Sequence, residues 1–260
     1  MASADIDGAS LHYRAAGDPA RPCVVLSNSL GTDLGMWDAQ AARLADNFFV
    51  LRYDTRGHGG SGRGNGKESF DIARLGRDVL GLLDVLGIAR AHFCGISMGG
   101  LTGQWLGIHA PQRIGRLVLA NTAARIGSAE GWQARAALVR SEGMDGVADG
   151  AAARWFGASF IERAPGVVAD MIAGLRAQDA EGYAACCDAL AGCDLRADAA
   201  RIGSPTLVIA GRDDPVTTVA DGEWLAQQVP GARLAVVEAS HLSNIEAEAA
   251  FTALLQGFLD

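Results

Sequence analysis

Short runs of consecutive apolar residues alternate with longer segments of helical periodicity along most of the chain. The apolar runs lie at residues 23–27, 48–53, 92–94, 114–120, 205–210 and 234–237. Runs of this length are typical of parallel strands that are buried on both faces. Helices are expected at residues 36–46, 70–86, 101–109, 219–228 and 246–259, and a hairpin is expected to turn at Asp7-Gly8. Strands that alternate with helices predict an α/β fold with a mostly parallel, twisted sheet flanked by helices.

The alternation stops between residues 123 and 203. This segment contains alanine-rich helical runs, separated by glycine and proline, and no convincing strand. Because it follows the predicted strand 114–120, it should emerge at the carboxyl edge of the sheet. We therefore expect a core formed by residues 1–122 and 204–260, covered by a helical cap, or lid, formed by residues 123–203.

The predicted strand 92–94 runs into Gly95-Ile96-Ser97-Met98-Gly99, which has the pattern Gly-x-Ser-x-Gly. A serine in such a sharp turn between a strand and a helix is held above the sheet in strained backbone geometry. The N–H group of Met98 would point to the place where a negative charge develops. The pattern can also arise by chance in a chain with 34 glycines, but the strand before it and the helix after it favour a catalytic Ser97.

A nucleophilic serine needs a base, and the chain offers five histidines. His241 directly follows the last predicted strand, so it should lie at the same edge of the sheet as Ser97. This position makes His241 the favoured base. His58 lies in a glycine-rich loop and remains an alternative.

The carboxylate that orients the base is expected after the predicted strand 205–210, where Asp213 and Asp214 are both available. The turn favours Asp214, and Asp213 is expected to cap the helix at residues 219–228. The resulting order of serine, aspartate and histidine along the chain is that of an α/β-hydrolase triad: Ser97, Asp214, His241.

The loop after strand 23–27 should supply a second donor for the oxyanion that forms in acyl transfer. The N–H group of Leu30 is the expected donor, beside that of Met98. Asn28-Ser29 stands where His-Gly commonly precedes this donor. Because the donor is a backbone group, the difference leaves the oxyanion hole in place, and the two side chains are expected to add hydrogen bonds near the substrate.

The composition argues against several other classes of function. With 22 basic and 30 acidic residues the net charge is −8, which disfavours nucleic acid or an anionic membrane as a partner. There is no stretch of ~20 apolar residues and no basic, apolar leader, so a soluble cytoplasmic protein is expected. The five cysteines match no disulfide or zinc pattern, and segment 57–62 lacks the spacing of a dinucleotide site. Neither a metal nor a cofactor is expected.

Longer segments carry a more specific resemblance. They are Ser27–Thr32 with Met36–Asp38, Arg52–Gly59, Cys94–Gly100 with Gly103–Pro111, and Asn121–Ala124. On these segments the chain resembles the α/β-hydrolase superfamily over nearly its whole length and, within it, the bacterial 3-oxoadipate enol-lactonases. The resemblance implies hydrolysis of a small anionic lactone, 3-oxoadipate enol-lactone, to 3-oxoadipate in the β-ketoadipate pathway of aromatic catabolism. The implied mechanism uses a Ser-His-Asp triad and an acyl-enzyme.

The free carboxylate of such a substrate needs a cation, and the expected cap is the place to seek it. Its candidate arginines and tryptophans are Arg125, Arg135, Arg140, Arg154, Trp132 and Trp155. We expect Arg135 and Trp132 to bind the substrate, because they follow the first turn of the cap.

Other functions of the same fold remain alternatives. A carboxylesterase or a cofactor-free perhydrolase would share the triad without needing an anion site. A non-catalytic ligand receptor with a vestigial triad is less favoured, because a receptor needs neither a complete triad nor an oxyanion hole.

Overall fold

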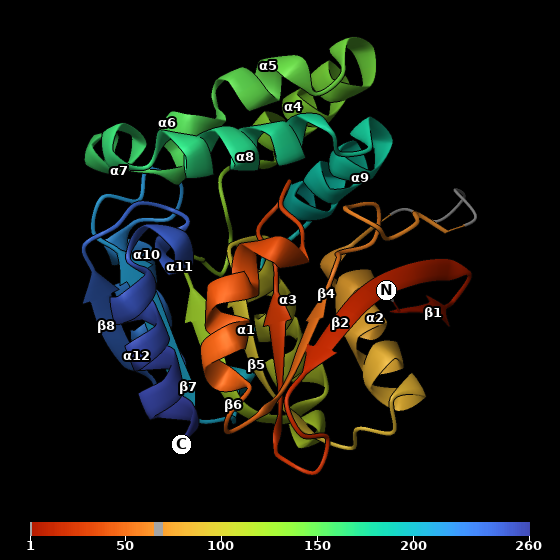
Figure 1. The fold of residues 1–260 in the computed structure, drawn as a ribbon, viewed down its shortest axis with the longest axis vertical. Coiled ribbons are helices and arrows are strands. Elements are labelled where there is room, and N and C mark those ends of the chain that lie inside the picture. Colours follow the sequence, from red (N-terminus) through yellow and green to blue (C-terminus); the bar gives the residue numbers. More distant parts are fainter. Residues whose placement is uncertain (1, 65–69) are drawn as a thin grey trace.

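The computed structural model describes residues 2–64 and 70–260. An eight-stranded sheet crosses the molecule in the order β1-β2-β4-β3-β5-β6-β7-β8 (Figure 1). The strands are β1 (Ala2–Ile6), β2 (Ala9–Ala16), β3 (Cys23–Ser27), β4 (Phe49–Tyr53), β5 (Ala91–Ile96), β6 (Ile114–Ala120), β7 (Thr206–Gly211) and β8 (Arg233–Val237). β2 pairs antiparallel with β1 and β4, and all the other pairs are parallel. The predicted mostly parallel sheet and its N-terminal hairpin are confirmed.

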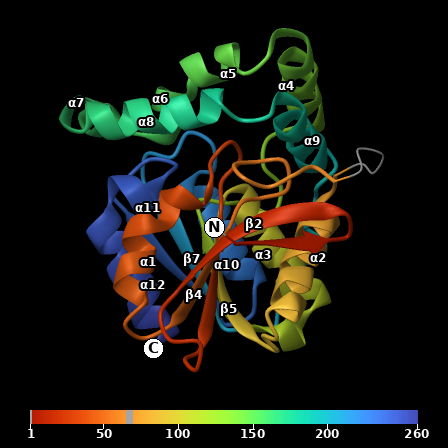
Figure 2. The same ribbon diagram turned by 45° about the vertical axis from the view of Figure 1, so that its right-hand side comes forward.

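Helices cover both faces of the sheet, which is why its central strands are largely apolar. In β3, Val24 and Leu26 belong to one apolar core, whereas Val25 belongs to a second core on the opposite face. Figure 2 shows α1 and α12 on one side of the sheet and α2 and α3 on the other. The helices that accompany the sheet are α1 (Asp38–Leu44), α2 (Ile72–Val85), α3 (Met98–His109), α10 (Val219–Gln228), α11 (Ser243–Glu246) and α12 (Glu248–Leu259).

The helices begin and end close to the predicted positions, with three differences. The expected helix 36–46 starts as a 3-10 turn at Leu34–Trp37, because the Asp33 side chain accepts a hydrogen bond from Gly35 N–H. α3 begins earlier than expected, directly after Ser97, and the last helix divides at Ala247 into α11 and α12. Further 3-10 turns lie at Pro111–Arg113 and Ala199–Arg201. No helix in the described ranges combines the length and the apolar character needed to cross a membrane.

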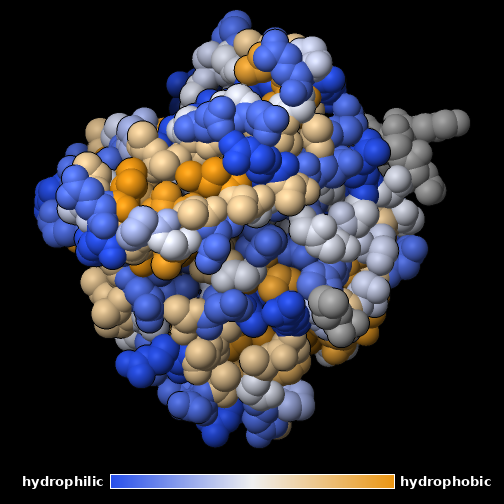
Figure 3. All heavy atoms as spheres, turned by 45° about the horizontal axis from the view of Figure 1, so that its top comes forward, coloured by the Kyte–Doolittle hydropathy of each residue, from blue (hydrophilic) through white to orange (hydrophobic). Residues whose placement is uncertain are grey.

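Between β6 and β7 the chain forms a layer of helices above the carboxyl ends of the strands (Figure 1). These helices are α4 (Ala129–Glu142), α5 (Asp145–Asp149), α6 (Ala151–Trp155), α7 (Ala158–Arg163), α8 (Pro165–Arg176) and α9 (Ala180–Ala191). Figure 3 looks toward this layer and shows apolar side chains gathered in a band across it. The division into a core of residues 1–122 and 204–260 and a cap of residues 123–203 stays a prediction, and "cap" below denotes residues 123–203.

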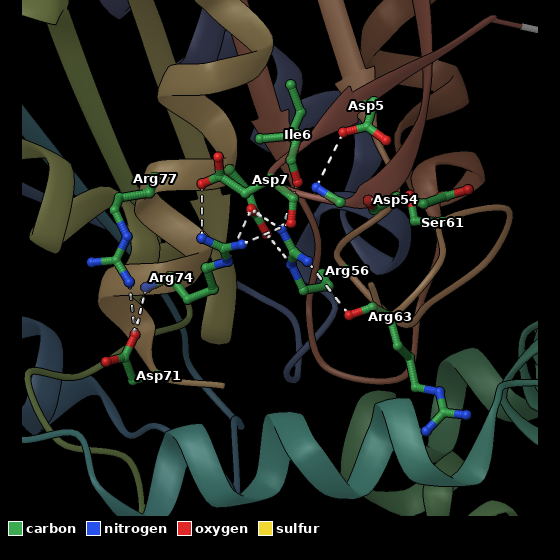
Figure 4. Close-up of polar contacts among 12 residues, drawn as sticks. Asp5, Ile6, Asp7, Asp54, Arg56, Ser61, Arg63, Asp71, Arg74 and Arg77 are labelled. Atoms are coloured by element: carbon green, nitrogen blue, oxygen red, sulfur yellow. Dashed lines mark hydrogen bonds and ion pairs between the residues drawn. The ribbon is translucent and has the colours of Figure 1, made fainter. Parts of the chain in front are cut away.

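An ionic network, buried at Arg56 and Asp78, fastens the N-terminal hairpin to α2 and to the loop after β4 (Figure 4). Arg56 donates to Asp78 through Nε at 2.8 Å and to the carbonyl of Ile6 at 3.1 Å. Arg74 donates to the Asp7 carboxylate at 2.9 Å. The same loop meets the cap, where Gly59 N–H donates to Gln178 Oε1 at 2.8 Å. The contact between Gly59 and Gln178 ties this loop to the cap.

Candidate active site

Ser97 lies in the turn between β5 and α3 with φ 58° and ψ −115°, in the left-handed region that residues other than glycine rarely adopt. The two flanking glycines make this turn possible. A Cβ on Gly95 would lie 2.1 Å from the carbonyl oxygen of Gly99, and one on Gly99 would lie 2.4 Å from that of Ser27. The strained elbow expected from the sequence is therefore present, and it raises Ser97 at the carboxyl edge of the sheet.

His241 and Asp214 meet at that edge. His241 Nδ1 lies 2.8 Å from Asp214 Oδ2, and both side chains are buried. Because Nδ1 is bound to the carboxylate, Nε2 is the ring nitrogen left to accept a proton. His241 and Ser97 line the same pocket. The structure thus brings together the three residues expected to form the triad, and their catalytic roles are proposals.

The environment of Asp214 keeps its carboxylate ionised. Burial alone would raise the pKa of Asp214, but the hydrogen bond and charge of His241, together with hydrogen bonds from Asn121 and Thr217, hold it below its ordinary value. Thr217 Oγ1 donates to Oδ2 at 2.8 Å, and the N–H groups of Val216 and Thr217 donate to Oδ1. An ionised, fully bonded carboxylate fixes the imidazole tautomer and stabilises the imidazolium that forms when His241 takes a proton.

Asn121 has a supporting role that the sequence alone, where it appears only as part of the segment Asn121–Ala124, did not reveal. Asn121 follows β6 with φ 41°, and its Nδ2 donates to Asp214 Oδ2 at 3.0 Å and to the carbonyl of Ser240 at 3.1 Å. Ser243 Oγ donates to Asn121 Oδ1. The side chain therefore ties Asp214 to the loop that carries His241. A polar residue at the end of a buried strand was the one available signal.

Glu246 is a second residue that sequence reasoning missed. Its carboxylate accepts hydrogen bonds from Ser240 N–H at 2.8 Å and from Gly157 N–H of the cap at 3.1 Å. Leu242 N–H donates to the carbonyl of Trp155 at 3.0 Å. The loop on either side of His241 is thereby fastened to the cap, which couples the position of the base to the position of the cap.

The loop after β3 approaches the elbow closely. Gly99 N–H donates to the carbonyl of Asn28 at 3.1 Å, and Leu30 lines the pocket with Ser97. Within residues 2–64 and 70–260, the N–H groups of Leu30 and Met98 make no hydrogen bond. Two unengaged backbone donors on segments held together in this way are suited to stabilise an oxyanion. Their assignment to the oxyanion hole is a proposal.

Only one of the two side chains expected near the substrate reaches the pocket. The Asn28 side chain turns into the core, where Nδ2 donates to the carbonyl of Tyr53 at 2.8 Å and Oδ1 accepts from Trp37 Nε1 at 3.0 Å. Ser29 does line the pocket. The expectation for Asn28 was wrong, because its amide satisfies buried partners of the neighbouring strand and helix.

The structure also corrects the role expected of Asp213. The N-cap of α10 is Thr218, which forms a capping box with Asp221, and Asp213 takes no part in it. Asp213 is exposed, and its N–H donates to the carbonyl of Ala239 at 3.1 Å. The turn between β7 and α10 is long enough to place Asp213 away from the start of the helix.

His58, the alternative base, lies outside the pocket. Its ring is 6.2 Å from that of Tyr183, and its Nδ1 is 3.5 Å from the carbonyl of Arg56. Burial lowers the pKa of His58 to about 4, which makes it a weak base at neutral pH. Neither Asp213 nor Asp214 contacts it.

The cap forms the other wall of the pocket. Its lining residues from the cap are Trp132, Arg135, Arg154, Trp155, Leu175 and Tyr183. The structure therefore brings Trp132 and Arg135 to Ser97 as expected and adds Arg154. The Arg135 guanidinium lies 4.9 Å from the centre of the Trp132 ring.

Two of the four candidate arginines are neutralised elsewhere. Arg125 pairs with Asp194, and Arg140 pairs with Glu181 and Asp188. In the part of the chain that the structure describes, neither Arg135 nor Arg154 pairs with a carboxylate. Burial, and then repulsion from Arg135, lowers the pKa of Arg154. The pocket thus holds two adjacent cations and no acid to balance them, which favours an anionic ligand.

Comparison with known proteins identifies the family. A sequence model of the alpha/beta hydrolase fold matches residues 22–160. The chain belongs to the α/β-hydrolase family. It is 52% identical to 3-oxoadipate enol-lactonase 2 of Acinetobacter baylyi, over 93% of this chain and 90% of the relative. It is 44% identical to 3-oxoadipate enol-lactonase 1 of the same organism, over 97% and 94%. The crystal structure of the enol-lactonase from Burkholderia xenovorans LB400 superimposes with a TM-score of 0.96 at 49% identity and covers 99% of each chain.

This α/β-hydrolase has a second hollow, which lies at the opposite end of the strands. It has an empty volume of about 670 Å³ and is lined by residues that include Arg90, His92 and Arg116. Ser97 and His241 do not line it. Among the described residues no group of three or more histidine, cysteine or acidic side chains could hold a metal ion.

Proposed function

We propose that this α/β-hydrolase is a carboxylic ester hydrolase that converts 3-oxoadipate enol-lactone to 3-oxoadipate in the β-ketoadipate pathway. One observation carries the proposal: Ser97 and His241 share a buried pocket with two unpaired cations, Arg135 and Arg154. A nucleophile beside an anion site suits a lactone that bears a carboxylate. The names of the relatives at 52% and 44% identity support the same substrate.

The proposed reaction begins with acylation. His241 Nε2 takes the proton of Ser97 while Oγ attacks the lactone carbonyl carbon. The N–H groups of Leu30 and Met98 stabilise the oxyanion, and Asp214 stabilises the imidazolium. Collapse of the tetrahedral intermediate breaks the bond between the acyl carbon and the ring oxygen. The ring oxygen leaves as an enolate.

The enolate is a better leaving group than an alkoxide, so it needs little help from the acid form of His241. It takes the proton that His241 gained from Ser97, which returns the imidazole to its neutral form, and it tautomerises to the ketone, which stays tethered to Ser97 through the acyl group. Water, deprotonated by His241, then attacks the acyl carbon and releases 3-oxoadipate with its new carboxylate. Ser97 recovers its proton from His241, which completes the cycle.

Recognition of the carboxymethyl group is assigned to the cap. Arg135 and Arg154 would bind its carboxylate, and Trp132 would pack beside Arg135. A carboxylate that is shielded from water by the cap interacts more strongly with guanidinium than an exposed ion pair does. Tyr183 stands nearby as a neutral wall, because burial raises its pKa to about 12.

The test compares an anionic and a neutral substrate in matched arginine variants. Arg135→Met and Arg154→Met keep much of the side-chain length and remove the charge. Each should lower kcat/KM for the lactone by about 10- to 100-fold, the loss typical of one hydrogen bond to a charged group. Most of the loss should appear in KM. The rate with p-nitrophenyl acetate should change little, because this ester carries no carboxylate.

Arg140→Met is the control, because Arg140 is paired with Glu181 and Asp188 on the surface. It should leave both substrates unaffected. Equal losses on lactone and neutral ester in the Arg135 and Arg154 variants would contradict an anion site and favour a simple carboxylesterase. The cytoplasmic location and the expectation of no nucleic-acid or membrane partner stay predictions.

A further inference from the structure

The Ser29 hydroxyl is left unexplained by the reaction described so far. Ser29 is 2% exposed and lines the pocket with Ser97 and His241. Its carbonyl oxygen accepts hydrogen bonds from Thr32 N–H at 3.2 Å and from Thr32 Oγ1 at 2.8 Å. Its own Oγ has no hydrogen-bond partner among residues 2–64 and 70–260. Ser29 Oγ is not one of the fully buried unpaired side-chain atoms of the described residues, so the little surface that Ser29 keeps is consistent with a hydroxyl open to a molecule in the pocket.

The neighbouring polar groups of the loop are all engaged. Ser27 Oγ lies 2.8 Å from the Tyr53 hydroxyl, and the Asn28 amide is bonded to Tyr53 and Trp37. Thr32 Oγ1 donates to Ser29 O. Ser29 Oγ is therefore the side-chain donor of this loop that is available to a bound molecule.

Covalent geometry fixes where this hydroxyl can act. Ser29 Oγ is separated from the nitrogen of Leu30 by Cβ, Cα and C alone, so the two atoms lie at most about 5 Å apart. Leu30 N–H is a proposed oxyanion donor. The hydrogen bond from Gly99 N–H to Asn28 O holds this part of the loop against the start of α3, beside Met98. A hydroxyl next to Leu30 N–H, on a residue that lines the pocket with Ser97, is within range of the oxygen that the two backbone groups would bind.

We propose that Ser29 Oγ donates a third hydrogen bond to the oxyanion, which makes Ser29 a catalytic residue beside the backbone donors Leu30 and Met98. The hydroxyl turns its proton toward the carbonyl oxygen as negative charge builds on it during attack by Ser97. The bond is stronger in the transition state than in the bound substrate, so it lowers the barrier rather than tightening binding. This inference rests on the proposed acyl transfer at Ser97 but not on the identity of the lactone.

The test measures kcat and KM for Ser29→Ala with both the enol-lactone and p-nitrophenyl acetate. Every ester forms the same oxyanion, so kcat should fall about 10- to 100-fold on both substrates while KM changes little. This pattern differs from that of the arginine variants, which affect KM for the lactone alone. Ser27→Ala, which removes a hydroxyl bonded to Tyr53 in the same loop, is the matched control and should leave kcat unchanged.

Two further variants separate hydrogen bonding from packing. Ser29→Thr keeps the hydroxyl and should recover most of the rate, whereas Ser29→Cys keeps the size but is a weak donor and should be as slow as Ser29→Ala. A fast Cys variant with a slow Thr variant would overturn the proposal in favour of a steric role. A loss confined to the lactone, or no loss at all, would overturn it as well. Thermal unfolding of each variant checks that the fold is retained.

A third readout keeps this test independent of the substrate assignment. A small sulfonyl fluoride reacts with an activated serine: the Oγ–S bond forms, fluoride leaves, and His241 takes the proton. Its sulfonyl oxygens occupy the oxyanion hole, so Ser29→Ala should slow modification of Ser97, followed by intact mass, by about tenfold. If the parent protein reacts with this probe but hydrolyses neither ester, the proposed function fails while the role of Ser29 is still decided. If Ser97 does not react at all, both proposals are refuted.

Discussion

Buried His58 predicts a specific loss of stability in mild acid. Its ring is 1% exposed, and in the described part of the chain its Nε2 has no hydrogen-bond partner. Burial lowers the pKa from 6.5 to about 4, although the Arg56 carbonyl and the charges of Asp54 and Asp179 act in the opposite direction. The Tyr183 ring also faces it, and that group is neutral in this pH range. Protonation of His58 is therefore much harder in the folded protein than in the unfolded chain.

The sign of the effect follows from proton binding. Between pH 6.5 and about 4 the unfolded chain binds a proton at His58 and the folded protein does not. The contribution of neutral His58 to the unfolding free energy is consequently fully present above pH 6.5 and is lost as the pH drops toward 4. A difference of 6.5 − 4 = 2.5 pKa units corresponds to a loss of about 3 kcal/mol of unfolding free energy over the whole range. Most of this loss has occurred by about pH 4.5.

The assay is urea unfolding of the parent and of His58→Gln at pH 7.5 and at pH 4.5. The parent should lose about 2–3 kcal/mol more unfolding free energy than the variant, because Gln cannot be protonated. Carboxylates such as Asp214 titrate equally in both proteins and cancel in the comparison. His109→Gln, at an exposed position of α3, should behave like the parent. Equal acid sensitivity of the parent and His58→Gln would refute the reasoning. Lactone hydrolysis by His58→Gln should persist, because His58 lies outside the pocket.

Two further predictions concern the groups that hold His241. Asp214→Asn should lower kcat by about 10³- to 10⁴-fold in stopped-flow or steady-state assays while the fold is retained, because the amide stabilises the wrong imidazole tautomer; a loss below tenfold would contradict the role of Asp214. Glu246→Gln weakens the hydrogen bonds from Ser240 and Gly157. It should lower the unfolding free energy by about 1 kcal/mol and reduce kcat more than it raises KM; a change in KM alone would contradict a link between Glu246 and the base.

The sequence predicted those parts of the molecule in which local pattern and long-range packing agree. Cys23–Leu26 is apolar because both faces of the strand are covered, and together with Ser27 it forms a central strand as expected. The pattern Gly95-x-Ser97-x-Gly99 predicted the elbow, and the structure shows the reason, because no side chain fits at either glycine. His241 and Asp214 each follow a parallel strand, and carboxyl ends of parallel strands meet at one edge.

Other features depend on contacts that no local pattern records. Whether Asn28 or Ser29 faces the pocket is decided by buried partners on β4 and in the turn before α1, which lie 25 and 9 residues away along the chain. The presence of Arg154 beside Arg135 depends on how the cap helices pack against one another. Asn121 and Glu246 are ordinary polar residues in the sequence, and only the folded chain brings them to Asp214 and Ser240.

The central claim is tested most directly by the kcat/KM of the parent protein for 3-oxoadipate enol-lactone, followed by the loss of its ultraviolet absorbance, with p-nitrophenyl acetate and Ser97→Ala alongside. The account predicts that the lactone is preferred over the neutral ester by about 100-fold or more, and that Ser97→Ala lowers turnover by about 10⁴-fold or more. No preference for the lactone would contradict the proposed substrate. Lactone turnover that survives in Ser97→Ala would contradict the proposed nucleophile.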